Sequence, residues 1–387
     1  MSVPALRFKE FSSNWVEKTL GDIAIFSKGK GISKSDIDEN GKTFCIRYGE
    51  LYTTYGETIY DVKSKTNVNV DNLVLSEIND ILIPASGETQ IDIATASCVQ
   101  VSGVGLGGDL NIIKSEENGI FLAYYLNSQK RLDIAKFAQG NSVVHLYASQ
   151  LKLLDLKLPS LPEQTKIANF LTAVDEKITL LTQKAALLSQ YKKGVMQQIF
   201  SQELRFKDDD GQEFPEWEEA SIGSLFIIKA GGDIASSNVS SVKTDIYTYP
   251  IFSNSEKNLG LFGYTDEFKI NTESITVTGR GTLGIAIPRY APYYPIVRLL
   301  SLIPKLTFNV YFGASAINML NVFIESTGVP QLTAPQISDY VISFPSLPEQ
   351  NKIANFLTAI DEKITNNQTQ LDAVKQYKHG LLQQMFV

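Results

Sequence analysis

The chain has few of the residues that build metal and redox sites. Its 387 residues include two cysteines, Cys45 and Cys98, and two histidines, His145 and His379. These four residues lie far apart and lack the spacing of zinc ligands. We interpret the cysteines as small apolar fillers in a reducing compartment, and the sequence predicts no metal site.

Long apolar runs are also missing. No stretch of about 18 apolar residues occurs, and the N-terminus lacks the apolar centre of a secretory signal. We therefore expect a cytoplasmic protein that does not cross a membrane. The length favours two to three domains, each with its own core.

Motifs for catalysis are absent as well. The sequence contains neither a GxxxxGK[ST] phosphate loop nor a nucleophile elbow. Two GxGxxG runs occur, at residues 103–108 and 279–284, but neither leads into the helix that a dinucleotide site needs. The first is followed by strand-like sequence, and the second by residues 285–288, which end in proline and cannot open a long helix. We interpret both runs as turns, and the sequence predicts a protein that is not an enzyme.

The dominant feature is a duplication. Residues 159–179 read PSLPEQTKIANFLTAVDEKIT, and residues 345–365 repeat them with only two differences. The lead-in sequence is duplicated too, because LRFK occurs at residues 6–9 and again at 204–207, each time followed by a tryptophan. The chain start therefore matches the segment that follows the first helical repeat, which indicates a cyclic organisation.

Each repeat reads as the start of a long helix. SLPE has the spacing of a capping box, with proline in the first turn. Apolar residues then alternate in steps of four and three, as in a coiled coil, and Asn367 replaces the apolar residue of the second seam. We predict an α+β protein with two β-rich domains joined by two long antiparallel helices and a pseudo-two-fold, cyclic organisation. The predicted divisions are residues 1–158, 159–203, 204–344 and 345–387, alternately β-rich domain and helical spacer.

Within the β-rich parts we expect strands at Ile78–Ile83 and Ser274–Val277. The spacing of apolar residues predicts one helix over Phe121–Phe137, with a counterpart at Phe308–Phe323.

Charge is unevenly distributed. The net charge of −7 argues mildly against nucleic-acid binding. Residues 274–324, however, contain no acid but several basic residues and the tyrosines Tyr290, Tyr293 and Tyr294, and Lys28, Lys30 and Lys34 lie together in another acid-free stretch. Such stretches permit a basic surface on an acidic protein, although each is also compatible with an ordinary solvated face.

Two pairs of loops match between the halves but carry different polar residues. Gly87–Ala94 aligns with Gly279–Ala286, and the His145–Tyr147 segment aligns with Gln331–Thr333. Arginine pairs with guanine and glutamine with adenine in the major groove, so different side chains on one scaffold suit two readers of two DNA sequences. Ordinary loop divergence is the alternative for any single residue. The predicted DNA-binding residues are Lys28, Lys30, Lys34, Glu88, Thr89, Gln90, His145, Tyr147, Arg280, Thr282, Arg289, Tyr290, Gln331 and Thr333.

The duplicated LPEQxKIANFLTxxDEKI segment, the QYKxG that follows it and the LRFK lead-in resemble the specificity (S) subunits of Type I restriction–modification systems. The resemblance covers the whole chain. It implies a DNA-recognition subunit in which each variable domain, about residues 23–158 and 224–344, reads one half of a bipartite site. A helix of about 55 Å, at ~1.5 Å per residue, would span roughly 16 base pairs of unread spacer.

The resemblance also implies partners. It predicts double-stranded DNA, two methyltransferase (modification) subunits docked on the helices, and restriction/translocase subunits. S-adenosylmethionine, ATP and Mg²⁺ are then expected on these subunits, with no cofactor on this chain. The predicted partner-binding residues are those of the helix starts, Glu163, Gln164, Lys166, Glu349, Gln350 and Lys352.

Two other functions remain open at this point. The first is a cytoplasmic coiled-coil scaffold with two protein-binding domains, and the second is a carbohydrate-binding protein. Replacement of residues 23–158 separates the first from DNA recognition, because it would change a scaffold's protein partner but half of a DNA reader's site.

Overall fold

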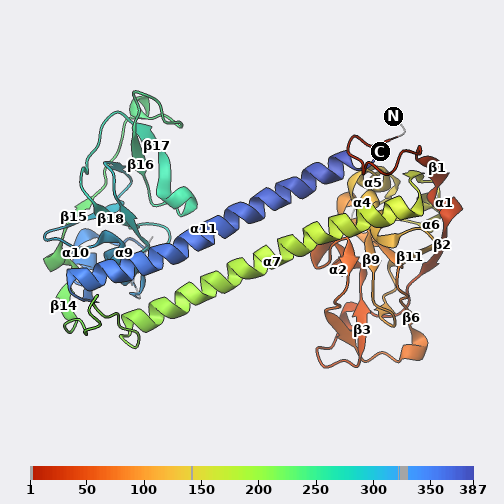
Figure 1. The fold of residues 1–387 in the computed structure, drawn as a ribbon, viewed down its shortest axis with the longest axis horizontal. Coiled ribbons are helices and arrows are strands. Elements are labelled where there is room, and N and C mark those ends of the chain that lie inside the picture. Colours follow the sequence, from red (N-terminus) through yellow and green to blue (C-terminus); the bar gives the residue numbers. More distant parts are fainter. Residues whose placement is uncertain (1–2, 141–142, 321, 323–329) are drawn as a thin grey trace. The chain divides into compact units, whose positions relative to one another are not determined.

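The computed structural model describes residues 3–140, 143–320, 322 and 330–387, which divide into two compact units. The first unit comprises Met1–Gln183 and Gln368–Val387, and the second comprises Lys184–Asn367. Each unit contains one β-rich domain and one half of each long helix, α7 (Leu161–Phe200) and α11 (Leu347–Gln384) (Figure 1). The unit boundaries therefore fall inside the two helices.

The two long helices run antiparallel within each unit, because the N-terminal half of one lies with the C-terminal half of the other. The first apolar residues of each predicted seam are buried in the core of a β-rich domain, together with residues near the end of the other helix. In the first unit the buried helix residues include Ile167, Leu171, Val174 and Leu381, and in the second they include Val195, Ile199, Ile353, Leu357 and Ile360.

The first unit is built on two sheets. A five-stranded sheet has the order β2-β11-β7-β9-β4, and a four-stranded sheet has the order β5-β3-β10-β6. Two-stranded pairs β1-β13 and β12-β8 complete the unit. Its strands are β1 (Val16–Thr19), β2 (Ala24–Lys28), β3 (Thr43–Ile46), β4 (Thr58–Ile59), β5 (Ser64–Thr66), β6 (Val74–Leu75), β7 (Ile81–Pro84), β8 (Ser86–Gly87), β9 (Ser97–Val99), β10 (Gly105–Leu106), β11 (Leu110–Ser115), β12 (Val144–His145) and β13 (Asp155–Leu158). Its shorter helices are α1 (Leu20–Ile23), α2 (Tyr48–Thr53), α3 (Gln90–Ile93), α4 (Gly119–Ser128), α5 (Arg131–Phe137) and α6 (Ala148–Leu151).

The second unit repeats the central part of this plan. Its four-stranded sheet β15-β21-β18-β19 corresponds to β2-β11-β7-β9, and the pair β14-β22 corresponds to β1-β13. A separate three-stranded sheet has the order β17-β16-β20. The strands are β14 (Glu218–Ser221), β15 (Phe226–Ala230), β16 (Tyr249–Phe252), β17 (Leu261–Thr265), β18 (Ser274–Val277), β19 (Ala286–Arg289), β20 (Tyr294–Pro295), β21 (Leu300–Pro304) and β22 (Val341–Phe344). The shorter helices are α8 (Ile222–Leu225), α9 (Val310–Asn318) and α10 (Ala334–Ser338).

The cyclic organisation is confirmed within the first unit, where the chain start meets the chain end. The backbone N–H of Leu6 donates to the carbonyl of Gln384 at 2.9 Å, and the hydroxyl of Tyr125 donates to the carbonyl of Val387 at 2.9 Å. In the second unit the same lead-in follows α7 directly. Each domain therefore rests on a helix end and a lead-in segment of the same kind.

The prediction of a single helix over Phe121–Phe137 is wrong. The chain forms α4 and α5 there, and the first ends at Ser128. The Ser128 hydroxyl donates to the carbonyl of Tyr124 at 2.7 Å, a side-chain bond that weakens helix continuation. The counterpart expected at Phe308–Phe323 is helical over Val310–Asn318, and residues 321 and 323 lie outside the described residues.

Candidate functional site

Three predicted residues of the first unit come together at the end of β12. The rings of His145 and Tyr147 stack with centroids 6.3 Å apart, and the Lys28 ammonium lies 5.9 Å from the centre of the Tyr147 ring. All three side chains are exposed. Because His145 pairs with Ser86 across β12 and β8, the predicted Glu88–Gln90 segment begins two residues beyond this pair. We call Lys28, Glu88–Gln90, His145 and Tyr147 the first polar surface.

A buried asparagine holds the backbone beneath the first polar surface. Asn111 is fully buried, and its side-chain amide donates to the carbonyls of Leu146 at 3.0 Å and Pro84 at 3.4 Å. The N–H of Leu146 donates to the carbonyl of Ala85 at 3.0 Å. The strand that carries His145 is therefore fixed to the strand that leads to Glu88.

The second unit joins two predicted residues in the corresponding place. The Arg280 guanidinium lies 3.5 Å from the side-chain oxygen of Gln331, and the N–H of Leu332 donates to the carbonyl of Gly279 at 3.0 Å. A Cβ on Gly279 would lie only 2.8 Å from the carbonyl oxygen of Leu332, so the close approach of the two backbones requires glycine. We call Arg280 and Gln331 the second polar surface.

The two surfaces correspond, but the expected alignment is shifted by two residues. The bonds from Leu146 and Leu332 place Ala85 opposite Gly279, where Gly87 was expected. At the other end Ala96 and Ala286 are both held by a side-chain amide, from Asn127 and Asn318 respectively. The first unit therefore has four more residues between these points, and they accommodate α3. The second unit makes a tight turn instead, with positive φ at Gly281 and Gly284.

Three predicted threonines have bonding partners inside the chain. Thr89 caps α3 by accepting the N–H of Asp92 at 3.1 Å, and the Thr333 hydroxyl donates to Gln336 at 2.7 Å at the start of α10. The Thr282 hydroxyl donates to the Glu256 carboxylate. Ser, Thr and Asp commonly make such local bonds at helix starts and turns. These three residues therefore shape the loops of the two surfaces.

The prediction that Arg289 contacts DNA is wrong. Its side chain is 7% exposed, and its guanidinium packs over Phe252 at 3.5 Å from the ring centre. The guanidinium donates to the Leu259 carbonyl at 2.7 Å and to the Thr276 hydroxyl at 3.0 Å, and burial lowers its pKa to about 10. The neighbouring Tyr290 is 60% exposed. Lys30 and Lys34 are exposed in the loop after β2.

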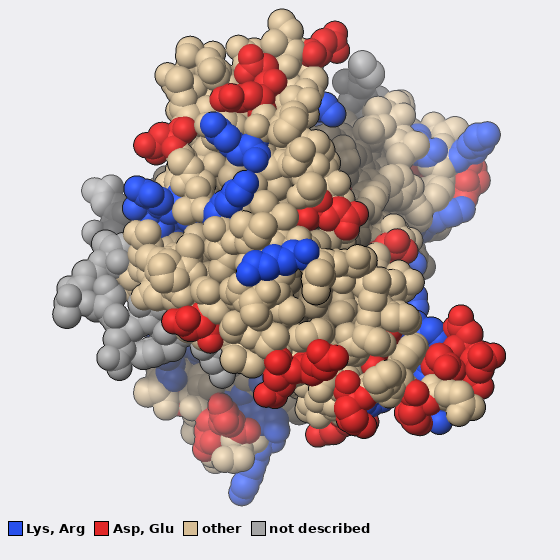
Figure 2. Space-filling model, turned by 90° about the vertical axis from the view of Figure 1, so that its left-hand side faces the viewer, with Lys and Arg blue, Asp and Glu red and all other residues tan. Residues whose placement is uncertain are grey.

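Figure 2 shows no continuous basic band among the described residues on the face that it draws. Lysine and arginine side chains stand there as separate groups on an uncharged surface, and many aspartates and glutamates gather along the lower edge. Charge alone therefore does not outline a DNA path on this face.

The four acidic and amide residues predicted to bind partners are buried, and that prediction is wrong for them. Glu163 and Glu349 are 1% and 0% exposed, and Gln164 and Gln350 are 0% and 3% exposed. Each glutamate forms a bidentate pair with a lead-in arginine. The Arg7–Glu163 distances are both 2.7 Å, and the Arg205–Glu349 distances are 2.9 and 3.0 Å. Because the carboxylates bind arginine, the Ser-x-x-Glu segments do not form the expected capping boxes.

The two glutamines connect the helix starts to the β-rich domains. The Gln164 side-chain oxygen accepts the N–H of Asn118 at 3.1 Å, and Gln350 accepts the N–H of Asn309 at 3.0 Å. These asparagines are the N-caps of α4 and α9. The duplicated LPEQ sequence therefore binds the lead-in segment and the domain helix of its own unit. Lys166 and Lys352 are only partly covered, and they pair with Glu10 and Asp209.

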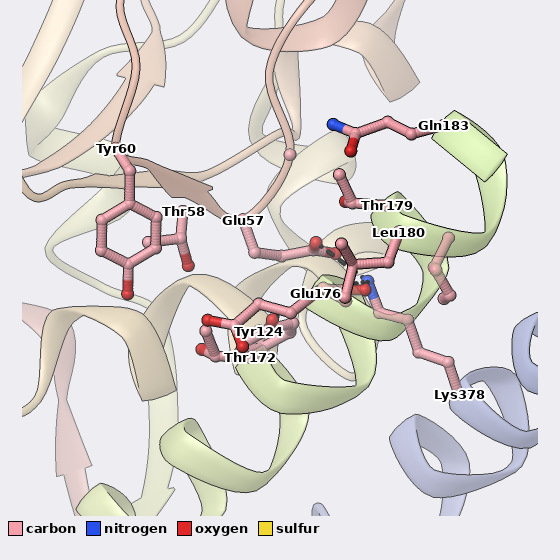
Figure 3. A pocket seen from close by; sticks show the side chains of 13 residues that line it. Glu57, Thr58, Tyr60, Tyr124, Thr172, Glu176, Thr179, Leu180, Gln183 and Lys378 are labelled. Carbon is pink, nitrogen blue, oxygen red and sulfur yellow. Dashed lines mark hydrogen bonds and ion pairs between the residues drawn. The ribbon is translucent and has the colours of Figure 1, made fainter. Parts of the chain in front are cut away.

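A cluster that the sequence did not predict joins the domain of the first unit to both long helices (Figure 3). The Tyr124 hydroxyl of α4 donates to Asp175 of α7 at 2.5 Å, and Lys378 of α11 pairs with Asp175 at 2.8 Å and Glu57 at 3.1 Å. Burial, together with the charge of Asp175, raises the pKa of Tyr124. Burial alone would lower the pKa of Lys378, but Glu57 and Asp175 outweigh it and raise that pKa.

The second unit contains the corresponding cluster. Lys192 of α7 pairs with Asp361 of α11 at 2.5 Å, and the Tyr311 hydroxyl of α9 donates to the same carboxylate. Burial and the hydrogen bond to Asp361 raise the pKa of Tyr311. Both clusters border cavities, of about 690 Å³ in the first unit and about 940 Å³ in the second.

The described residues contain neither a group of three His, Cys, Asp or Glu side chains suited to a metal ion nor a helix with the length and apolar character needed to cross a bilayer.

Comparison with known proteins identifies the family. The model of the Type I restriction modification DNA specificity domain matches residues 12–190 and 215–376. A Mycoplasma pneumoniae protein that bears the name of a type I specificity subunit is 29% identical over 86% of this chain and 85% of its own length. The specificity subunit of a type I restriction enzyme of Escherichia coli is 25% identical over 66% of this chain and 64% of its own length.

A solved structure shows the same fold. The S subunit of a type I restriction–modification system from M. genitalium superposes with a TM-score of 0.69 at 18% identity, covering 100% of this chain and 99% of that one. The fold and the family match define a DNA specificity subunit. The chain belongs to the Type I restriction–modification specificity family, and it is a non-catalytic, DNA-recognising subunit that assembles with other subunits of such a system.

Proposed function

We propose that the two polar surfaces read the two halves of a bipartite DNA site. The observation that carries this proposal is that the two units hold different polar side chains on the same backbone arrangement. Leu146 and Leu332 each donate one backbone hydrogen bond to the facing loop. The polar side chains next to this bond are His145 and Tyr147 in the first unit, and Arg280 and Gln331 in the second. Base edges in the major groove are distinguished by such differences in donors and acceptors.

In this proposal α7 and α11 set the length of the unread spacer and dock two methyltransferase subunits, with restriction/translocase subunits joining the complex. S-adenosylmethionine, ATP and Mg²⁺ are then bound by those subunits, which supply the chemistry. The overall charge of −7 supports a division of labour, because an acidic chain gains affinity for phosphates from basic partners. The side chains of this chain supply base recognition.

The proposal is tested by single-molecule methylation mapping of the source genome with and without the gene. Deletion is expected to remove one bipartite methylated motif, and complementation restores it. Exchange of residues 23–158 for another family member's segment is expected to change one half-site and leave the other unchanged. An unaltered methylome, with the methyltransferase expressed and active, would overturn the proposal.

Arg280 offers a test at one residue. Because its guanidinium is exposed beside Gln331, Arg280→Ala is expected to weaken binding of the assembled complex to its site by about 1–3 kcal/mol, the usual cost of losing a bidentate base contact. The loss should relax the requirement at one base of one half-site. Binding to duplexes with every base at each half-site position measures both effects.

Arg280→Lys is the matched control, because it keeps the charge but loses the planar fork of donors. We expect it to lose base discrimination as Arg280→Ala does, while the salt dependence of binding stays near that of the unaltered complex. Equal weakening on all sequences by Arg280→Ala, with recovery in Arg280→Lys, would show instead that Arg280 contacts a phosphate.

A further inference from the structure

The Tyr–Asp–Lys cluster of the first unit is a three-way joint. Its tyrosine comes from the domain helix α4, its aspartate from α7 and its lysine from α11. The domain contributes a second anchor through Glu57, which lies just before β4 and binds the same lysine at 3.1 Å. Figure 3 shows Lys378 reaching from α11 toward Glu57 and the α7 side chains. One cluster therefore ties the domain to both helices at once.

The joint of the second unit uses the same chemistry with the helices exchanged. Here α11 supplies the aspartate, Asp361, and α7 supplies the lysine, Lys192. The tyrosine again comes from the domain helix. Among the residues that the structure describes, the second joint contains no acid corresponding to Glu57, so it has one acid fewer than the first.

The tyrosines reach equivalent carboxylates from different positions. Asn118 and Asn309 are the N-caps of α4 and α9, and both bind the side chain of the LPEQ glutamine. Tyr311 lies two residues after its cap, whereas Tyr124 lies six residues after its own, about one helical turn further. Both units therefore contain the tyrosine–aspartate hydrogen bond, although the tyrosine occupies a different position on the domain helix in each unit.

Directional bonds control orientation in a way that apolar packing does not. An ion pair with a hydrogen-bonded carboxylate is satisfied over a narrow range of distances and angles. Beside each joint the surface is open, since Tyr124, Asp175 and Lys378 line the cavity of the first unit and Tyr311, Asp361 and Lys192 line that of the second. Close packing therefore does not fix the domain on this side.

We propose that each Tyr–Asp–Lys cluster is the positioning joint that fixes the angle of its recognition domain on the helical pair, and thereby determines which spacer length the subunit accepts. The proposal rests on the function proposed above. One added base pair moves a half-site by about 3.4 Å and turns it by about 34°, because B-DNA has about 10.5 base pairs per turn. A recognition domain that is held at one angle cannot accommodate both the shift and the rotation of its half-site.

The test measures methylation by the reconstituted complex on duplexes whose spacer is one base pair shorter, native or one longer. Tyr311→Phe, Asp361→Asn and the double variant remove polar bonds but keep the shape of the side chains. We expect the double variant to raise the off-length to native-length methylation ratio by about ten- to hundredfold, the factor for losing a charged hydrogen bond. In the first unit Tyr124→Phe with Asp175→Asn should give a smaller increase, because Glu57 still holds Lys378.

Tyr191→Phe and Tyr377→Phe are matched controls, since both tyrosines are on the long helices and more than half exposed. They should leave the ratio unchanged. Thermal unfolding of every variant shows whether it remains folded. If a double variant does not fold, the single Tyr→Phe variants, which keep the aspartate–lysine ion pair, are measured in its place. Two results would refute the proposal that the cluster fixes the angle of the domain. One is a folded variant with an unchanged ratio of off-length to native-length methylation, and the other is an equal loss of methylation at all three lengths. Failure of the unaltered complex to methylate any bipartite duplex would instead refute the proposed function.

Discussion

Glu349→Ala is expected to lower the free energy of unfolding of the second unit by about 3–5 kcal/mol, the typical cost of removing one partner of a buried ion pair. The Glu349 side chain is 0% exposed and accepts two hydrogen bonds from the Arg205 guanidinium. The Arg205 side chain is 18% exposed. Loss of Glu349 removes the buried carboxylate from Arg205, whose remaining carboxylate neighbour, Glu216, is exposed and 3.7 Å away. Urea unfolding followed by Trp217 fluorescence measures the effect.

The double variant Arg205→Met/Glu349→Met is the control. Replacing both charges by apolar side chains of similar size removes the unpaired arginine, so the double variant is expected to recover most of the lost stability. The two tryptophans, Trp15 and Trp217, lie in different units, and a Trp15→Phe background isolates the second signal. Equal destabilisation in the single and double variants would show that packing, and not charge, explains the loss.

Phe386→Ala is expected to destabilise the first unit by about 3–5 kcal/mol, the usual cost of truncating a buried phenylalanine. The Phe386 ring is 4% exposed, stacks on Tyr125 at 5.5 Å and lies 5.5 Å from Phe121. These rings contact Trp15, whose fluorescence in a Trp217→Phe background reports the unfolding of this unit.

Phe200→Ala serves as the counterpart in the second unit, because Phe200 contacts Trp217 and Phe312. It should shift the Trp217 transition and leave that of Trp15 in place. If Phe386→Ala left the Trp15 transition unchanged, the end of the chain would contribute nothing to the stability of the first unit.

The long helices and the duplication were predictable because both follow from local sequence. Helix α7 begins at Leu161 and α11 at Leu347, within two residues of the predicted starts, and the strand Ser274–Val277 has the predicted bounds. Apolar periodicity and exact repetition need no knowledge of distant contacts. Pairing of the two repeats follows from their complementarity.

The role of the LPEQ residues was not predictable, because it depends on a lead-in segment more than a hundred residues away. A conspicuous charged motif at a helix start was interpreted as a partner site, whereas Glu163 and Gln164 are buried within the unit. The repeat did contain a signal, since LRFK and LPEQ are duplicated together. Charged Arg and Glu repeated as a pair indicate a mutual contact.

The sequence predicted some of the neighbouring residues in the two polar surfaces. His145 lies beside Tyr147 in the first unit and Arg280 lies beside Gln331 in the second, but the predicted alignment of the first loop is wrong by two residues. Sequence alignment placed glycine on glycine, whereas the inserted helix α3 displaces Gly87. The sequence did not predict the Tyr–Asp–Lys joints, because Tyr124 and Tyr311 occupy different positions on corresponding helices. Only three-dimensional structure shows that they reach the same carboxylate.

The meeting of the chain start and the chain end has a consequence for synthesis on the ribosome. The second unit consists of one continuous segment, Lys184–Asn367, so it can complete its core while the remaining residues are still being translated. The first unit needs Gln368–Val387, which are translated after the whole second unit. The domain translated before the other therefore completes its core after it, and a nonsense codon within residues 368–387 damages the recognition domain that lies more than two hundred residues earlier in the chain.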